Sequence, residues 1–539
     1  MNKKKFISIL ITLIVWFIMF YIYLPPINIK SNEFWNFSIS AIIVAIILNM
    51  WTIISNIFQR RSYEEFDETG PKFKKFKIII ALTIFVGGVY LVGNILSSPI
   101  IRASDYSKLL DVKEGNFEQD ITEVNFSKIP VIDRDSAAII AERKMGSMVD
   151  MVSQYEVSEY YSQINYNQRP IRVTPLKYAN EIKWLTNMKE GIPAYIMIDM
   201  TNQDAELIKL QEGIKYSPAD HFNRDLLRHI RFNYPTYMFR SLNFEIDDNG
   251  TPYWICPVVD HTIGLFGGKD IKGAVLVNAI NGENTYYDLE KVPEWVDKVY
   301  DAELLIQQYD YYGKLRNGFI NSIFGQRDCL RTTKGHNYMA LNDDVWVYTG
   351  VTSVSGDLSN VGFVLMNQRT QETKYYQISG AEEFSAMSSA EGQVQHLGYK
   401  ATFPLLLNIA GEPTYFLSLK DNAGLVKMYA MINIEKYQNV AIGDTVENCE
   451  KTYKSYLKSN GITTNNTNIN VVNGTISFIK DVVIDGNTCY FIKLANNENI
   501  YSVYVKNNIS IIDKNIGDNV EIEYTSTEDE NIYNIVNIK

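Results

Sequence analysis

Three long runs of apolar residues dominate the pattern of the first hundred residues. They cover 6–24, 40–58 and 78–96, and none of them contains a charged side chain. Each run is about 19 residues long, which at about 1.5 Å of helix per residue matches a hydrocarbon core of about 30 Å. The pattern therefore predicts three transmembrane helices, with residues 1–97 as a membrane anchor.

Lysine and arginine are distributed unevenly around these runs. Residues 3–5 are all lysine and the segment 59–77 holds six basic residues, whereas the segment 25–39 holds only Lys30. By the positive-inside rule the N-terminus is expected in the cytoplasm. Three crossings would then place residues 98–539 outside the cytoplasm, as part of a multi-pass protein of the cell membrane.

Shorter patterns follow the apolar runs. Residues 98–128 are polar and predict a stalk, and two longer regions, 129–300 and 301–459, mix helical stretches with apolar strands that end at glycine turns. Residues 460–469 are rich in Asn and Thr and predict a linker, and five short strands in 470–539 predict a small barrel. The expected fold class is α+β: three transmembrane helices, tandem units of a helix on an antiparallel sheet, and a C-terminal β-barrel.

Two stretches of the middle region repeat one another. FEIDDNGTPYWIC at 244–256 and LLNIAGEPTYFLS at 406–418 both read as a strand, a glycine turn and an aromatic-led strand. VLVNAINGENTYY and VLMNQRTQETKYY, aligned without gaps from Val275 and Val364, share Val, Leu, Asn, Glu and two Tyr positions. Recurrence of this kind indicates related structural units.

The sequence of these units resembles a known domain family. IDRDSAAIIAE at 132–142 is a helix start that Asp133 or Asp135 can cap, and it resembles the opening of PepSY domains. DDNGTPYWI at 247–255 and GAVLVNAINGE at 273–283 resemble strands of the PepSY sheet. The resemblance spans 130–440 as degenerate copies and implies an extracytoplasmic binding or regulatory module that brings no catalytic residues with it. Gly517 and Asp518 resemble a turn of the OB-fold, so the barrel is expected to be OB-like.

The distribution of charge along the chain narrows the classes of partner that it can bind. The net charge is −11, but residues 1–102 carry 11 basic against 5 acidic side chains, and the acidic excess lies in the remainder. The barrel region 470–539 has 5 lysines against 10 acidic residues. An acidic surface repels phosphate, so nucleic acid is excluded as a partner. The expected partners are the lipid bilayer and another envelope protein or a wall component.

Candidate chemistry is sparse. The four cysteines, Cys256, Cys329, Cys449 and Cys489, form no CxxC pair and are expected to be scattered buried thiols. No pair of the five histidines has metal-ligand spacing. The five are His221, His229, His261, His336 and His396.

Three further segments have a plain structural interpretation. Asp247 to Gly250 resembles the start of a calcium loop but lacks the twelfth-position Glu, so a hairpin turn is expected. GLFGGKD at 264–270 resembles a phosphate loop but predicts a loop between strands. The small residues in 380–392 fit tight internal packing better than a partner surface.

The sequence therefore assigns no catalytic, cofactor-binding or metal residues and no cofactor. A Ser/His/Asp site assembled from distant residues stays open. We expect a membrane-anchored extracytoplasmic binding, scaffolding or regulatory protein of the cell envelope rather than an enzyme. Two alternatives remain: an accessory subunit of a secretion, conjugation or transport complex, and an extracytoplasmic hydrolase with a dispersed active site. The Asn-, Ile- and Lys-rich usage is typical of a Gram-positive source.

Overall fold

The computed structural model falls into two compact units, Met1–Tyr453 and Lys454–Lys539, and each is described by itself. The described residues are 3–59, 71–123, 128–341, 343–353, 359–459, 470–484, 487–495, 497–505, 508–526 and 532–539.

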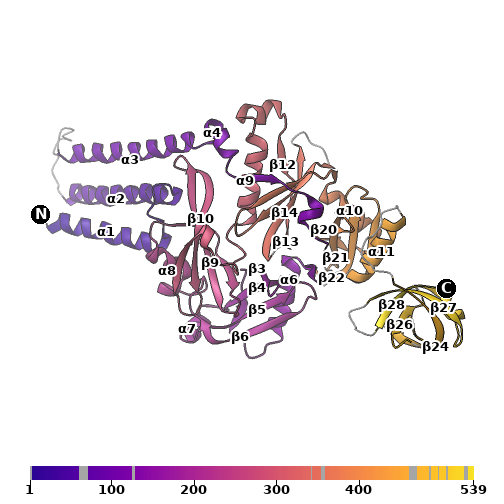
Figure 1. The fold of residues 1–539 in the computed structure, drawn as a ribbon. Helices are drawn as coiled ribbons and strands as arrows, with labels where there is room; N and C mark the ends of the chain where they lie inside the picture. Colours follow the sequence, from indigo (N-terminus) through magenta and orange to yellow (C-terminus); the bar gives the residue numbers. More distant parts are fainter. Residues whose placement is uncertain are drawn as a thin grey trace. The chain divides into compact units, whose positions relative to one another are not determined.

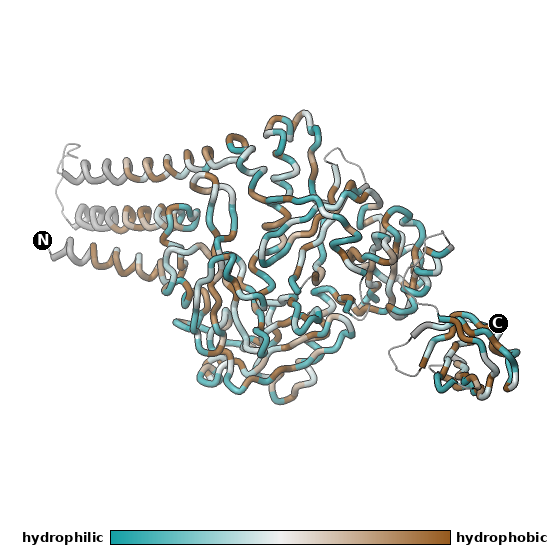
Figure 2. Tube along the Cα trace, in the orientation of Figure 1, coloured by the Kyte–Doolittle hydropathy of each residue, from teal (hydrophilic) through white to brown (hydrophobic). Residues whose placement is uncertain are grey.

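The first unit begins with three helices, α1 (Lys3–Tyr23), α2 (Asn32–Gln59) and α3 (Pro71–Leu96), which lie side by side (Figure 1). Apolar residues predominate along their described parts (Figure 2). The indole Nε1 of Trp16 donates to the carbonyl of Ala41 at 2.9 Å and ties α1 to α2. Many apolar side chains of α1 stay exposed, including Phe17 at 63% and Ile22 at 63%.

The prediction of three transmembrane helices at 6–24, 40–58 and 78–96 is wrong, as judged from the helices in the described part of the chain. No single helix in the described part of the chain is both long and apolar enough to cross a membrane. Ile9–Tyr23 and Asn32–Leu48 are apolar but shorter than the roughly 20 residues of a span. Ala81–Leu96 passes the same test only jointly with α4 (Pro99–Tyr106), across a bend of 48°.

The segment 98–128, predicted to be a stalk, is partly built into the first unit. After α4 it contributes β1 (Val112–Glu114) and the short helix α5 (Phe117–Asp120). β1 pairs in parallel with β17 (Thr373–Tyr376), and Ile121 is buried. Residues 124–127 lie outside the described residues.

The first sheet has the order β2-β4-β5-β6, with β3 also paired to β4. Its strands are β2 (Tyr155–Val157), β3 (Ser162–Tyr166), β4 (Arg169–Tyr178), β5 (Ile192–Asp199) and β6 (Ala205–Ile214). Helix α6 (Arg134–Gly146) packs on β5 and β6 through the fully buried Ala137 and Ala141, whose small side chains allow a close approach. The carboxylate of Asp133 caps α6 by accepting from the backbone N–H of Ser136 at 2.9 Å. Helix α7 (Glu181–Asn187) lies against β4.

The second sheet is antiparallel, with the order β11-β10-β9-β7 and β8 paired to β9. Its strands are β7 (Met238–Phe239), β8 (Asn243–Ile246), β9 (Pro252–Ile263), β10 (Gly267–Asn278) and β11 (Asn284–Asp288). Helix α8 (Leu226–Asn233) precedes them and buries Leu226 and Ile230. The β8–β9 hairpin turns through Gly250, whose φ of +78° favours glycine.

The third sheet has the order β1-β17-β16-β14-β12, with β13 paired to β14. The strands not yet given are β12 (Leu330–Thr332), β13 (Asn337–Leu341), β14 (Asp344–Ser353) and β16 (Gly362–Asn367). Helix α9 (Ala302–Leu315) buries Leu305 and Tyr309 in a core that contains Ile255 of the second sheet and Val347 of the third. This shared core fixes the second and third sheets against each other.

The described part of the first unit also contains a two-stranded sheet of β15 (Ser359–Asn360) and β18 (Gly380–Ala381), and a fourth large sheet with the order β19-β21-β22-β23 and β20 paired to β21. Its strands are β19 (Lys400–Ala401), β20 (Leu405–Ile409), β21 (Glu412–Lys420), β22 (Val426–Asn433) and β23 (Val440–Gly443). Helix α10 (Glu383–Gln393) contacts β21 and β23 through a face that includes the fully buried Ala386 and Ala390. The alanines of 380–392 thus serve internal packing, as expected, whereas Ser388 and Gly392 are exposed. The helix α11 (Val446–Ser459) follows this sheet.

The second unit contains a closed five-stranded barrel of order β24-β25-β26-β28-β27. Its strands are β24 (Asn470–Ile484), β25 (Asn487–Leu494), β26 (Ile500–Tyr504), β27 (Asn519–Ser526) and β28 (Ile532–Ile538). The core includes Ile492, Tyr501 and Ile522, one from each of three strands. Alternating apolar positions fill the interior, because successive side chains of a strand point to opposite faces.

Candidate functional site

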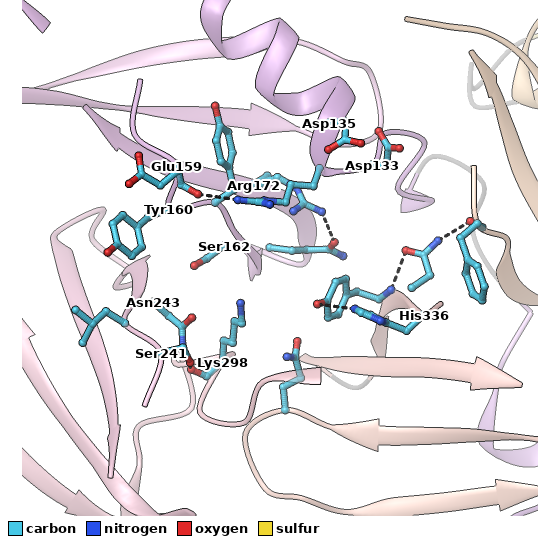
Figure 3. A pocket seen from close by; sticks show the side chains of 18 residues that line it. Asp133, Asp135, Glu159, Tyr160, Ser162, Arg172, Ser241, Asn243, Lys298 and His336 are labelled. Atoms are coloured by element: carbon cyan, nitrogen blue, oxygen red, sulfur yellow. Dashed lines mark hydrogen bonds between the residues drawn. The ribbon is translucent and has the colours of Figure 1, made fainter. Parts of the chain in front are cut away.

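A cavity of about 700 Å³ lies in the first unit, where the first three sheets meet. Its described lining comes from 133–135 and 159–163, from 241–243, and from 336–338, together with Arg172, Lys298, Gln368 and Phe403. Figure 3 shows Arg172 on one side of the space and Lys298, Asn243 and Ser241 on the opposite side, with His336 on a third. The cavity is thus built by residues far apart in the sequence.

Three strands at sheet edges converge on this cavity. β3 pairs with β4, β8 with β9 and β13 with β14, each along one side only among the described strands. β3 also contacts β8 and β14. The side chains of an edge strand can project into the space between sheets. In this protein the side chains that β3, β8 and β13 contribute to the cavity are polar.

Arg172 is the most enclosed cation of the lining. It lies on β4, in an otherwise apolar stretch, and is only 5% exposed. Its Nη2 donates to the Oε1 of Gln163 at 3.0 Å. Its buried Nε has no hydrogen-bond partner among the described residues, and the same is true of the Nε2 of Gln163. Burial lowers the pKa of the Arg172 guanidinium to about 10.

Lys298 approaches from the second sheet. Its backbone N–H donates to the Oε1 of Glu245 at 3.0 Å, and its carbonyl accepts from the Nδ2 of Asn243 at 3.1 Å. Burial lowers the pKa of its ammonium, although the carboxylates of Glu245 and Asp301 oppose that shift. Nearby, the buried Oγ of Ser241 has no partner among the described residues. The backbone contacts therefore hold Lys298 in place without pairing its charge.

Two carboxylates of the lining are engaged outside the cavity. Asp133 accepts from the ammonium of Lys420 at 2.6 Å as well as capping α6. Burial alone would raise the Asp133 pKa, but these hydrogen bonds outweigh burial and lower it. Glu159 forms a salt bridge with Lys177 at 3.3 Å. The third carboxylate, Asp135, lies on the exposed first turn of α6.

Arg134 and His336 complete the polar lining. The Nη2 of Arg134 donates to the carbonyl of Glu159 at 2.9 Å, and its guanidinium lies 5.9 Å from the centre of the Tyr161 ring. The Nε2 of His336 lies 3.1 Å from the Oη of Tyr338, and burial lowers the pKa of its imidazole. The hydroxyl of Tyr338 therefore fixes the orientation of the His336 ring.

A pair of buried carboxyl groups, Glu245 and Asp297, lies behind Lys298. Glu245 is fully buried and its oxygens accept from the backbone N–H groups of Asp297 and Lys298 at 2.9 Å and 3.0 Å. Burial raises the Glu245 pKa to about 7. Burial and the neighbouring Glu245 carboxylate raise the Asp297 pKa well above its ordinary value. The pair therefore carries a proton at near-neutral pH and does not fully neutralise Lys298.

The other histidines are dispersed. His221 is 2.7 Å from the carboxylate of Glu181, and His229 is 2.8 Å from the carbonyl of Gly282. His261 is buried in β9 and His396 is exposed after α10. Within the described ranges, no group of three or more His, Cys, Asp or Glu side chains could hold a metal ion.

The remaining sequence motifs are structural. Asp247 and Gly250 form the β8–β9 hairpin turn, with the N–H of Gly250 donating to the carbonyl of Asp247 at 2.8 Å, which confirms that prediction. Of the segment 264–270, residues 264–266 form the β9–β10 connection, where the Oγ of Ser97 accepts from the N–H groups of Leu265 and Phe266, whereas 267–270 already belong to β10; the loop between strands is therefore shorter than predicted. All four cysteines are free and buried, as predicted.

Sequence reasoning missed the residues that define the cavity, namely Arg172, Gln163, Lys298 and Ser241. They belong to no motif, and their spacing in the chain carries no periodic signal. One signal was available: Arg172 interrupts the apolar run of RPIRVTPLKY, and a charged residue at an inward-facing strand position requires a partner.

Comparison with known proteins adds little to this geometry. No protein-family model and no curated protein sequence matches the chain. Among solved structures, one similar chain is a levansucrase point mutant from B. megaterium, with 8% identity and a TM-score of 0.17 over 77% of this chain and 97% of that one. A score this low carries no argument about fold or activity.

Proposed function

We propose that this chain is a non-enzymatic binding protein of the cell envelope, which holds a ligand in the cavity between its first three sheets. The observation that carries the proposal is the cavity itself. Its volume of about 700 Å³ falls within the range of small-ligand sites, and buried polar groups from three separate sheets converge on it. A site built from rigid strands is suited to selective binding.

The chemistry of the lining favours binding over catalysis. His336, the histidine of the lining, is held by the hydroxyl of Tyr338. Nucleophilic catalysis needs a serine, threonine or cysteine within hydrogen-bond reach of a base. Among the described lining residues no hydrogen bond joins a hydroxyl to His336 other than that of Tyr338. The PepSY resemblance of 130–440 points in the same direction, because it implies a binding or regulatory module.

A location at a lipid bilayer is part of the same proposal. Exposed apolar side chains line the described parts of α1, α2 and α3, including Ile14, Phe17, Ile47 and Phe85. Basic residues outnumber acidic ones by six to four in the sequence 59–77, with four lysines within 72–77, and this excess would favour an anionic lipid surface. Fractionation of intact cells measures this: recovery in the soluble fraction rather than with the membranes would contradict it.

The binding function is tested with the purified full chain in mild detergent. We expect saturable ligand-induced stabilisation in thermal unfolding and no turnover of wall or peptide substrates. Turnover that disappears when one acidic residue or His336 is replaced would overturn the proposal in favour of the hydrolase alternative. A His336→Gln variant is the matched test, because it keeps a hydrogen-bonding group opposite Tyr338.

A further inference from the structure

The cavity contains buried donors that the fold does not use. The Nε of Arg172 and the Nε2 of Gln163 are enclosed and unpartnered among the described residues, and their side chains are 5% and 6% exposed. The Oγ of Ser241 on the opposite wall is also buried and without a partner. Buried polar groups in folded proteins are nearly always hydrogen-bonded, so three exceptions on residues that line one cavity indicate a ligand that brings acceptors to this lining.

The charges around the cavity point to the sign of that ligand. The carboxylates of Asp133 and Glu159 are already engaged with Lys420 and Lys177. The side chains of Arg172 and Lys298 form no salt bridge with any described residue. Burial lowers the pKa of both cations, because a buried charge loses its favourable interaction with water. An anion bound beside the two cations would offset that loss.

We infer that the cavity binds a small organic anion whose carboxylate or phosphate group lies between Arg172 and Lys298. This inference rests on the proposed binding function and names the class of its ligand. A guanidinium is planar and offers its N–H groups in a fixed fork that matches the oxygens of a carboxylate or phosphate. Lys298 supplies a point charge from the wall opposite Arg172, on the same side as Ser241 (Figure 3).

The size of the cavity distinguishes an organic anion from an inorganic ion. A volume of about 700 Å³ is far larger than one phosphate or acetate group needs. Aromatic side chains, among them Tyr160, Tyr338 and Phe403, line the rest of the space and offer apolar faces. The body of the ligand packs against these rings while its anionic head is fixed by the cations.

The experiment measures thermal unfolding and calorimetric binding of the full chain with four probes: glucose 6-phosphate, citrate, inorganic phosphate and neutral glucose, with KCl at matched ionic strength. We expect saturable stabilisation by the sugar phosphate or by citrate at about 10 mM or below, and none by glucose or KCl. Stabilisation by glucose 6-phosphate indicates recognition of phosphate, and stabilisation by citrate indicates recognition of carboxylate. Inorganic phosphate is expected to bind more weakly than the organic anion.

Two variants and one control make the assignment specific. Arg172→Met and Lys298→Met are expected to weaken anion binding by at least about tenfold. The control, Arg369→Gln, breaks an ion pair with Asp344 outside the cavity and is expected to keep wild-type anion affinity at a lower unfolding temperature.

Three outcomes overturn the inference: equal binding of glucose and its phosphate, wild-type anion affinity in Arg172→Met, or no saturable response to either class of anion. A neutral ligand that binds independently of Arg172 would leave the binding function standing while removing this assignment. Turnover of a bound anion would remove the binding function while leaving the role of Arg172 intact.

Discussion

Arg172 and Arg369 are two enclosed guanidinium groups in the first unit, and their surroundings differ sharply. Arg369 forms a two-point ion pair with Asp344, at 2.7 Å from its Nε and 2.9 Å from its Nη2. Asn367 donates to the same carboxylate at 2.8 Å, and the pair raises the pKa of Arg369. Among the described residues Arg172 has only a neutral amide as hydrogen-bond partner, and burial lowers its pKa. Both residues come from strands or strand ends, so local structure does not explain the difference.

The contrast separates a group that serves the fold from one that serves a ligand. A buried ion pair whose oxygens and N–H groups are hydrogen-bonded holds the chain in one conformation at the end of β16. A buried cation without a counter-charge destabilises the folded chain, and such strain is typical of binding sites. The four predictions that follow test this contrast, from the largest expected effect to the smallest.

Removing the carboxylate of the Asp344–Arg369 pair has the largest expected effect. Asp344→Ala leaves a mostly enclosed guanidinium and the amide of Asn367 without their acceptor, so the free energy of unfolding should fall by roughly 3–4 kcal/mol. Denaturant unfolding of the full chain measures it. A loss below about 1 kcal/mol would mean that the pair is no more structural than a surface ion pair.

The carboxyl behind Lys298 predicts a pH dependence of stability. The folded Glu245 pKa of about 7 lies above the ordinary 4.5, so the folded chain holds this proton more tightly than the unfolded chain. The resulting stabilisation is complete below about pH 4.5 and is lost as the pH rises through about 7, a change of about 3 kcal/mol. Glu245→Gln should flatten this decline, which unfolding curves between pH 4.5 and 8 measure. Equal slopes in the two proteins would contradict it.

Replacing Arg172 should change the free energy of unfolding in the opposite direction to breaking the Asp344–Arg369 pair. Arg172→Met removes a buried charge and keeps a long side chain, so the free energy of unfolding should stay the same or rise by about 1 kcal/mol. Thermal unfolding without ligand measures the change. A loss as large as that of Asp344→Ala would show that Arg172 is a structural residue and erase the contrast.

The exposed pair at the cavity rim should matter least. Lys177 and Glu159 keep 36% and 68% of their side chains exposed, and water and salt screen their attraction. Lys177→Ala should change the free energy of unfolding by less than about 0.5 kcal/mol. Its unfolding curve at low and high salt checks this: a larger effect at low salt would indicate that Glu159 must stay paired.

Local features of the structure could be predicted from the sequence because neighbours in the chain determine them. Asp133 caps α6, the segment around Gly250 turns between β8 and β9, and the four cysteines are isolated buried thiols. Each depends on a few adjacent residues or on composition. The apolar runs of 1–97 show the limit of composition, because no single helix among the described residues is both long and apolar enough to cross a membrane.

The cavity was decided by tertiary structure alone. Arg172 lies on β4, Ser241 in the connection between β7 and β8, and Lys298 in the segment before α9, and no local sequence pattern records that they line the same space. The shared core around α9, together with the contacts of β3 with β8 and β14, brings the sheets together and sets what each edge strand faces. The sequence determined which residues form strands, helices, caps and turns, because those depend on near neighbours and on periodicity. Which buried charges find a counter-charge depends on packing between distant segments, and only the folded chain shows it.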